Sequence, residues 1–147
     1  MHSKIIAKLL EQVELADEYL HENNRLKTYK LWPFKQHSPC SAQKMAEAGF
    51  IFVGSRQDPD SVKCFYCHKS LDGWEEEDNP WSEHLKHAPS CEFAKMQKAQ
   101  ANWTLAELID FFETFEVHSM NQHINRLKKS MAKCWEMKHG KVIKEEK

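Results

Sequence analysis

The sequence predicts an α+β chain, with a small, turn-rich domain in the middle and one long helix after it. Two observations support this prediction. Cysteine and histidine residues gather in the middle of the chain, among short stretches with strand and helix character that prolines and glycines separate. From Thr104 to about Lys138 the chain contains no proline or glycine, and its apolar residues recur at helical spacing.

Four residues of the middle domain predict a metal site. Cys64 and Cys67 form a C-x2-C pair, His84 follows after sixteen residues, and Cys91 follows after six more. Three thiolates and one imidazole suit a closed tetrahedral zinc site that leaves no position open for a substrate. The alternative, unrelated thiols beside a surface histidine, requires the pair and the aromatic residues around it to be coincidental. We therefore expect one structural zinc ion.

Composition narrows the class of protein. The 147 residues suffice for one ordinary domain, and the formal net charge of -1 points to no partner. No apolar run reaches the roughly 18 residues of a membrane span, and the first residues lack the apolar core of a signal peptide. Cys40 and Cys134 lie outside the metal set. A zinc site without a signal sequence favours reduced thiols, in the cytosol or nucleus, over a disulfide.

The first two parts of the chain are a helix and the metal-centred domain. Residues 1–22 predict an amphipathic N-terminal helix, which we expect to pack on the domain; a separate partner-binding helix is the alternative. The middle domain covers residues 23–96. Its expected elements are a helix over 41–48 that Ser41 caps and Gly49 ends, a hairpin of strands over 62–64 and 69–71, and a helix that begins at Pro80 and carries His84.

The last part, residues 103–140, predicts one long helix. Thr104 is a plausible N-cap, and Glu107 completes a capping box. A helix of about 35 residues spans about 50 Å, so much of its apolar stripe must find partner helices. The stripe slips by one residue before Met120, so two shorter helices that fold back are the alternative. Residues 141–147 form a basic tail, for which an ordinary solvated helix end is preferred over contact with nucleic acid.

Six short motifs follow one another along the middle domain: Arg25-x2-Thr28-Tyr29-x2-Trp32-Pro33, Met45-Ala46-Glu47-Ala48-Gly49-Phe50, Val62-x-Cys64-Phe65-x-Cys67, Leu71-x2-Trp74, Asp78-x-Pro80-Trp81-x-Glu83-His84 and Cys91-x-Phe93. Together they resemble the baculovirus inhibitor-of-apoptosis repeat, or BIR domain. The resemblance implies a three-stranded antiparallel sheet and short helices around one zinc ion. A single repeat followed by a long helix is similar to the survivin-like branch of the family, including its insect members.

An acidic run surrounds Trp74, with five carboxylates in the seven positions from Asp72 to Asp78. Such a run is ordinarily a solvated face, but an aromatic floor with carboxylate walls suits a cation such as a free α-amine. The resemblance implies a peptide groove, which in survivin-like proteins holds the histone-three tail, Ala-Arg-Thr, when that threonine is phosphorylated. By position it assigns Asp72 and Asp78 to the α-amine and the arginine, Leu71 and Trp74 to the alanine methyl, and Lys69 and His87 to the phosphate.

Two of these assignments carry a qualification from the sequence itself. Asp72 stands where survivin-like proteins usually have glutamate, so its carboxylate lies one methylene closer to the backbone. Without the resemblance, His87 reads as a surface histidine on the helix that carries His84.

Ser38-Pro39 is the available proline-directed phosphorylation motif near the Met-Ala-Glu-Ala-Gly-Phe stretch, and an ordinary turn is its alternative.

The resemblance also implies protein partners. The long helix is expected to bundle with borealin-like and inner-centromere-protein-like helices and so to recruit Aurora B kinase indirectly, through Phe112, Phe115, Ile124, Leu127 and Met131. A homodimer is expected at Trp103, Leu105 and Leu108, although Trp103 can instead pack on the zinc domain.

These expectations describe a non-enzymatic subunit of the chromosomal passenger complex that acts in mitosis and cytokinesis. No catalytic triad or Cys-His pair stands out in the sequence. The expected locations are the nucleus, the centromere, the spindle midzone and the cytoplasm. The rival within the family is an apoptosis inhibitor that binds caspases or alanine-starting antagonist peptides. The rival outside it is a nucleic-acid binder that uses the basic tail, which predicts strong, salt-sensitive binding to DNA.

Overall fold

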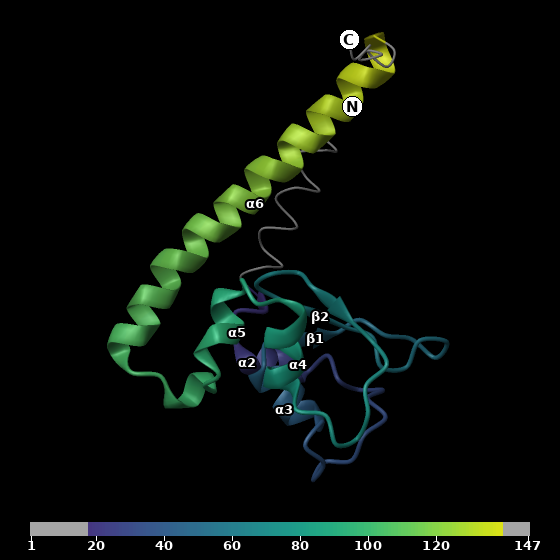
Figure 1. The fold of residues 1–147 in the computed structure, drawn as a ribbon, viewed down its shortest axis with the longest axis vertical. Helices are drawn as coiled ribbons and strands as arrows, with labels where there is room; N and C mark the ends of the chain where they lie inside the picture. Colours follow the sequence, from purple (N-terminus) through teal and green to yellow (C-terminus); the bar gives the residue numbers. More distant parts are fainter. Residues whose placement is uncertain (1–17, 140–147) are drawn as a thin grey trace.

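The computed structural model describes residues 18–139. The elements in chain order are α2 (Glu22–Leu26), α3 (Ala42–Glu47), β1 (Phe50–Phe52), β2 (Val62–Cys64), β3 (Ser70–Leu71), α4 (Pro80–His87), α5 (Glu92–Met96), the 3-10 helix η1 (Gln100–Asn102) and α6 (Leu105–His139). The short elements gather in one domain, from which α6 projects (Figure 1). The predicted N-terminal helix over 1–22 lies almost wholly outside the described residues, and the tail over 141–147 lies entirely outside them.

The sheet has three antiparallel strands in the order β1-β2-β3, as the resemblance implies. The predicted hairpin is present, and Val62 pairs with Leu71 across it. Its second strand begins at Ser70, one residue later than predicted, although the Lys69 carbonyl still accepts a hydrogen bond from the Cys64 amide at 2.9 Å. The chain pattern itself does not predict β1, because the strand is only three residues long and follows Gly49 directly.

Helix α3 occupies the predicted place, but the predicted side-chain cap is wrong. The Ser41 side chain makes no capping hydrogen bond, so the helix starts without one. Gly49 follows the helix with a φ of +87°, and a Cβ atom there would lie 2.6 Å from the Phe93 ring. Glycine alone meets both conditions, the left-handed backbone and the close approach of the ring.

A fully buried arginine ties the start of the domain to the rest of it. Arg25 lies in α2, and its guanidinium stacks 4.6 Å from the centre of the Phe65 ring. It donates four hydrogen bonds of 2.9 Å, to the carbonyls of Tyr19, Leu20 and Ala46 and to Oε1 of Gln100. Burial lowers the pKa of Arg25 to about 10, so the side chain stays charged at neutral pH. A buried charge is tolerated only when it is hydrogen-bonded in this way.

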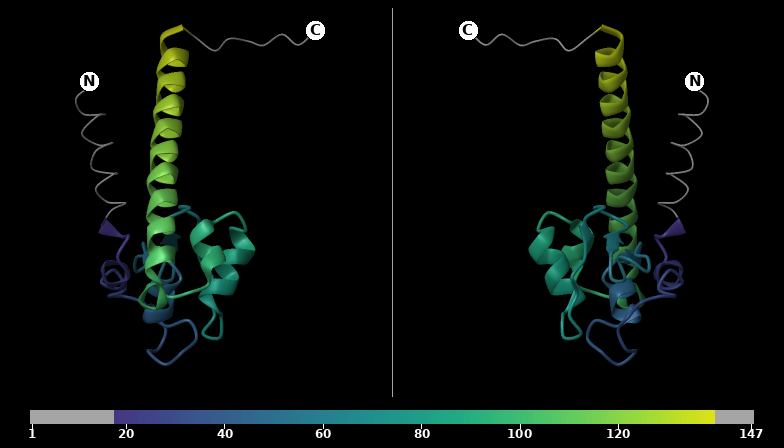
Figure 2. Two further views of the ribbon diagram at one scale, coloured as in Figure 1. Left: turned by 90° about the vertical axis from the view of Figure 1, so that its left-hand side faces the viewer. Right: turned by 90° about the vertical axis from the view of Figure 1, so that its right-hand side faces the viewer.

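Helix α6 is one continuous element of 35 residues, so the predicted alternative of two helices that fold back is wrong. The predicted capping box is present: the Thr104 amide donates to Glu107 Oε2 at 2.7 Å, and the Glu107 amide donates to Thr104 Oγ1 at 3.3 Å. The first turns of α6 lie against the domain, and the rest extends well beyond it in every view (Figures 1 and 2). None of the helices in the described range is long and apolar enough to cross a membrane.

Candidate functional site: a zinc centre and a peptide groove

The four predicted metal ligands come together in space. One ligand atom from each of Cys64, Cys67, His84 and Cys91 lies within 4.8 Å of all the others. Strand β2 ends at Cys64, Cys67 follows in the next turn, His84 lies in α4, and Cys91 directly precedes α5. Because the ligands come from separate elements, a metal ion bound to them joins the hairpin to both helices.

Groups around the ligands hold them in the orientation that a metal requires. The Cys64 sulfur accepts hydrogen bonds from the amides of Tyr66, at 3.3 Å, and Cys67, at 3.4 Å. The Nδ1 atom of His84 lies 2.8 Å from the Ala48 carbonyl, which leaves Nε2 facing the sulfurs, 3.6 Å from that of Cys67. A backbone carbonyl behind a ligating imidazole is the usual support in protein metal sites.

The four ligands interact strongly with one another, which shifts their pKa values in different directions. Burial raises the pKa of the Cys64 thiol, whereas hydrogen bonds with Cys64 and Cys91 hold the pKa of Cys67 far below its usual range. Burial lowers the pKa of His84, but hydrogen bonds with Cys67 and Cys91 outweigh it and raise the pKa to about 9. Protons shared among buried thiols and an imidazole are the ones that a metal displaces. Three cysteines and one histidine, with their ligand atoms close together and held by backbone hydrogen bonds, fit one structural zinc ion.

Most of the residues predicted to form a peptide groove line one small hollow, which is called the groove below. Its volume is about 120 Å³, and its lining residues are Leu71, Asp72, Gly73, Trp74, Asp78, Glu83 and His87. Five of the six residues that the resemblance assigned to the peptide are thus together. Gly73 has a φ of +72°, which turns the chain sharply between Asp72 and Trp74. Glycine suits this turn because other residues rarely adopt that conformation.

Trp74 is the buried member of this groove. Its backbone amide donates to Asp60 Oδ2 at 2.8 Å, and its ring meets Phe50 edge to face at 5.5 Å. Only 7% of the residue is exposed, and its Nε1 atom has no hydrogen-bond partner within the part of the chain that the structure describes. A buried donor of this kind is costly unless a ligand or water accepts its hydrogen bond.

The carboxylates give the groove a negative wall. Asp72 is exposed, and Asp78 is half-buried with its Oδ2 atom 2.8 Å from the Glu75 amide. Sequence reasoning did not assign a role to Glu83, which lies in α4 and adds a third carboxylate. The sequence could have predicted this role, because Glu83 precedes His87 by four residues and so lies on the same face of the helix.

The two residues predicted to meet a phosphate differ in their placement. His87 lines the groove, but its Nε2 atom lies 3.3 Å from Glu83 Oε2. Lys69 is exposed just before β3 and is not among the lining residues.

The predicted partner residues of α6 divide between two faces. On the outer face the exposed fractions are 72% for Leu105, 37% for Phe112, 41% for Ile124 and 70% for Met131, and Leu127 is half-buried. Leu108 is 37% exposed but lies seven residues before Phe115, towards the other face. The opposite face packs on the domain and includes Phe115. That residue is only 5% exposed and lies against Phe65 and Tyr66, so its prediction as a partner contact is corrected.

Trp103 also lies within the chain's own packing. Its ring meets Phe111 at 4.8 Å, and its Nε1 atom donates to the Lys98 carbonyl at 3.0 Å. This is the predicted alternative to a dimer contact. Leu105 and Leu108 stay exposed next to it.

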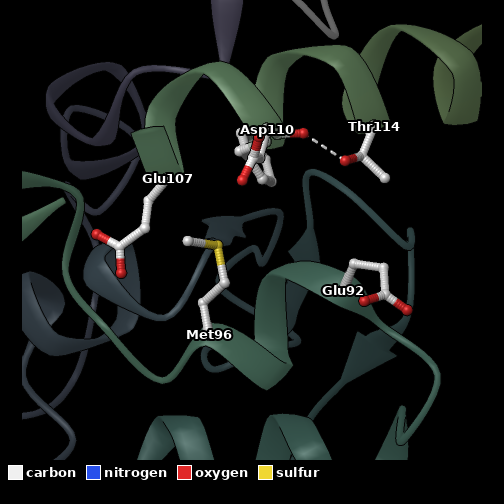
Figure 3. Close-up of a pocket in the computed structure, with 6 residues that line it drawn as sticks. Glu92, Met96, Glu107, Asp110 and Thr114 are labelled. Carbon is white, nitrogen blue, oxygen red and sulfur yellow. Dashed lines mark hydrogen bonds between the residues drawn. The ribbon is translucent and has the colours of Figure 1, made fainter. Parts of the chain in front are cut away.

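A second hollow lies where α5 meets α6 (Figure 3). Met96 and Phe111 line it together with Glu92, Glu107, Asp110 and Thr114. Glu107 is already engaged there by Lys98, at 2.8 Å, and by the capping box. This hollow belongs to the junction that starts α6, and it shares no residue with the groove.

Comparisons with known proteins agree with this arrangement. Residues 25–95 match the Inhibitor of Apoptosis domain, or BIR. The chain is 44% identical over 104 residues to Baculoviral IAP repeat-containing protein 5.2 of Xenopus tropicalis, an alignment that covers 68% of this chain and 67% of the relative. It is 42% identical over 118 residues to protein 5.2-B of Xenopus laevis, covering 76% and 75%. It is 43% identical over 88 residues to Baculoviral IAP repeat-containing protein 5 of Mus musculus, covering 60% and 63%. The chain therefore belongs to the BIR family, as a survivin-like protein with one BIR domain and a long C-terminal helix.

Proposed function

We propose that this chain is a non-enzymatic adaptor whose groove binds the free N-terminus of a peptide that begins with alanine. The observation that supports it most directly is the combination of three carboxylates, from Asp72, Asp78 and Glu83, with Trp74 in the lining of one hollow. An α-amine is the cation that carboxylates beside an aromatic ring suit.

The peptide we propose is the histone-three tail with its phosphorylated threonine. A phosphate carries a charge of about -1.5 to -2 near neutral pH, and His87 lies in the groove where a cation is needed. Glu83 competes for the same imidazole, so the phosphate must displace it from His87. Lys69 would approach from the strand beside Leu71.

A titration with four peptides tests the groove: the alanine-starting tail unmodified, phosphorylated, α-acetylated, and both phosphorylated and acetylated. We expect acetylation to abolish binding, because it removes the cationic amine. Phosphorylation should tighten binding at least about five-fold, a gain of about 1 kcal/mol from one charge-assisted contact at an exposed site. Equal affinity of the two acetyl-free peptides would reject the phosphate-reading role and leave the amine groove intact.

Variants of α4 separate the two parts of the proposal. Glu83→Gln removes the competitor of the phosphate and should strengthen binding of the phosphorylated tail relative to the unmodified one. His87→Ala should remove that preference. Glu92→Gln, which neutralises an exposed carboxylate outside the groove, is the matched control.

The outer face of α6 supports a second part of the role, as the docking surface for partner helices. Leu105, Phe112, Ile124 and Met131 leave apolar side chains exposed along this face of the helix, and such a stripe binds other amphipathic helices. We propose borealin-like and inner-centromere-protein-like helices as the partners, and through them Aurora B kinase, at the centromere and spindle midzone of dividing cells. Removal of residues 104–147 should abolish co-sedimentation with those helices.

Inhibition of apoptosis is the second candidate function. The features that favour it are the same amine-binding hollow and the absence of Lys69 from its lining, because an unmodified alanine-starting peptide needs no phosphate contact. A direct caspase assay, run beside the peptide titration, distinguishes the two. Caspase inhibition without a preference for the phosphorylated tail would favour this candidate.

A further inference from the structure

The face of α6 that meets the zinc domain changes character along the helix. Its first turns present Phe111 and Phe115, which are buried against the aromatic core. Residues 122, 125, 126 and 129 continue the same face at helical spacing. They line a pocket of about 330 Å³ between α6 and the zinc domain. Within residues 18–139 its lining is Lys63, His68, Gln122, Asn125, Arg126 and Lys129.

This pocket brings cations together from two parts of the fold. Lys63 comes from β2, whereas Arg126 and Lys129 come from α6. Among the residues that the structure describes, no carboxylate lines the pocket. Like charges that face one another repel, by about 1 kcal/mol per pair at 4 Å in water and by more near a protein surface. The chain as a whole has a formal net charge of -1, so this local excess of positive charge does not reflect its general composition.

The polar groups between the cations are held in place. The Gln122 side chain donates to the Tyr66 carbonyl at 3.2 Å, and the Tyr66 ring stacks on His118 of α6 at 4.3 Å with an angle of 8° between the planes. His68 adopts a φ of 61°, a left-handed conformation that is uncommon for a residue with a side chain, and its ring joins the lining. The pocket is therefore built on the zinc-bearing turn and on the docked part of the helix.

We propose that this pocket binds a phosphate monoester, carried on a phosphorylated serine or threonine side chain of a partner peptide. Such a group brings about two negative charges and three acceptor oxygens to one point, which matches the convergent lysine and arginine donors and the amide of Asn125. Nucleic acid instead spreads its charges along an extended basic surface, and its binding domains are typically strongly basic. A concave pocket in a chain with an isoelectric point of about 6.7 fits the single dianion better.

The phosphate pocket is independent of the peptide groove. The lining residues of the two hollows do not overlap. One lies at the α6 side of β2, and the other lies between β3 and α4. A chain with both sites holds a peptide end in one and a modified side chain in the other.

The test uses the full zinc-bound chain, titrated with O-phosphoserine, inorganic phosphate and unmodified serine while backbone and side-chain amide signals are followed by NMR. We expect saturable shifts at Lys63, Gln122 and Asn125 with both phosphates and none with serine. Arg126→Gln should weaken binding of O-phosphoserine about three- to ten-fold, the effect of one charge-assisted contact in a partly solvated site. Lys128→Gln is the matched control, because it removes one positive charge from an exposed position outside the pocket.

Each other outcome overturns the proposal. The absence of saturable shifts would show that the pocket holds no phosphate. Equal losses of affinity for O-phosphoserine in Arg126→Gln and Lys128→Gln would show only general charge attraction. A short DNA duplex that binds through these residues while O-phosphoserine does not would make the surface a nucleic-acid contact. The spectra also report whether each variant is folded. Binding of the alanine-starting peptide should be unchanged in Arg126→Gln, so failure here and failure of the groove are distinguishable.

Discussion

The zinc domain buries its large apolar side chains, whereas the outer part of α6 leaves them exposed. In the domain, Met45, Phe50 and Phe93 are fully buried within one chain. On the helix beyond the domain, Met131 is 70% exposed and Met137 is 74% exposed. The domain therefore contains the groups that stabilise it, whereas the outer helix leaves its apolar side chains for another molecule to cover.

This difference indicates where stability and assembly come from in the molecule. An isolated helix gains little stability from propensity and capping alone, and most helices in proteins depend on packing. The part of α6 that packs on Phe65 and Tyr66 has that support. We expect the outer part to gain comparable support only in a complex.

The largest effect should follow removal of zinc, because the ion joins β2, α4 and α5. Structural zinc can supply roughly 10–16 kcal/mol of apparent binding free energy, which is comparable to the whole free energy of unfolding of a small domain. Treatment with a strong chelator should abolish the cooperative thermal unfolding of the domain, measured by near-ultraviolet circular dichroism. Cys91→Ser should act in the same way, and Cys134→Ser, on the exposed part of α6, should not. A melting curve that the chelator leaves unchanged would contradict the structural role.

In both regions the sequence alone predicted some features and missed others. The zinc ligands and the capping box of Thr104 were predictable because each depends on a fixed local spacing. The partners of Arg25 were not, since Gln100 is 75 residues away and only the folded chain brings them together. Phe115 was assigned to the wrong face for a related reason. A helical stripe shows that residues share a face, but it does not show which neighbour, intramolecular or foreign, covers that face.

A matched pair of substitutions tests the division of α6 into two faces. Phe115→Ala should lower the free energy of unfolding by roughly 3 kcal/mol, the lower end for loss of a buried phenylalanine, because the helix can detach locally. Ile124→Ala, at a position 41% exposed, should change it by no more than about 0.5 kcal/mol. Urea unfolding measures both values. In binding to partner helices Ile124→Ala should instead weaken the complex, and a large loss of stability from Ile124→Ala alone would show that the outer face is already covered.

The smallest effect concerns the joint between the two regions, where Glu107 begins α6. Hydrogen bonds from Lys98 and then from Thr104 hold the pKa of Glu107 at about 2, below its ordinary value of 4.5. A carboxyl with a lowered pKa stabilises the folded state above its ordinary pKa, and that contribution is lost as the pH falls from 4.5 towards 2. Wild type should therefore exceed Glu107→Gln in thermal stability at neutral pH, and the difference should shrink on acidification through this range. Release of zinc in acid is common to both chains, so their difference isolates the carboxyl. Glu113→Gln, an exposed change of the same charge further along the helix, should show no such convergence.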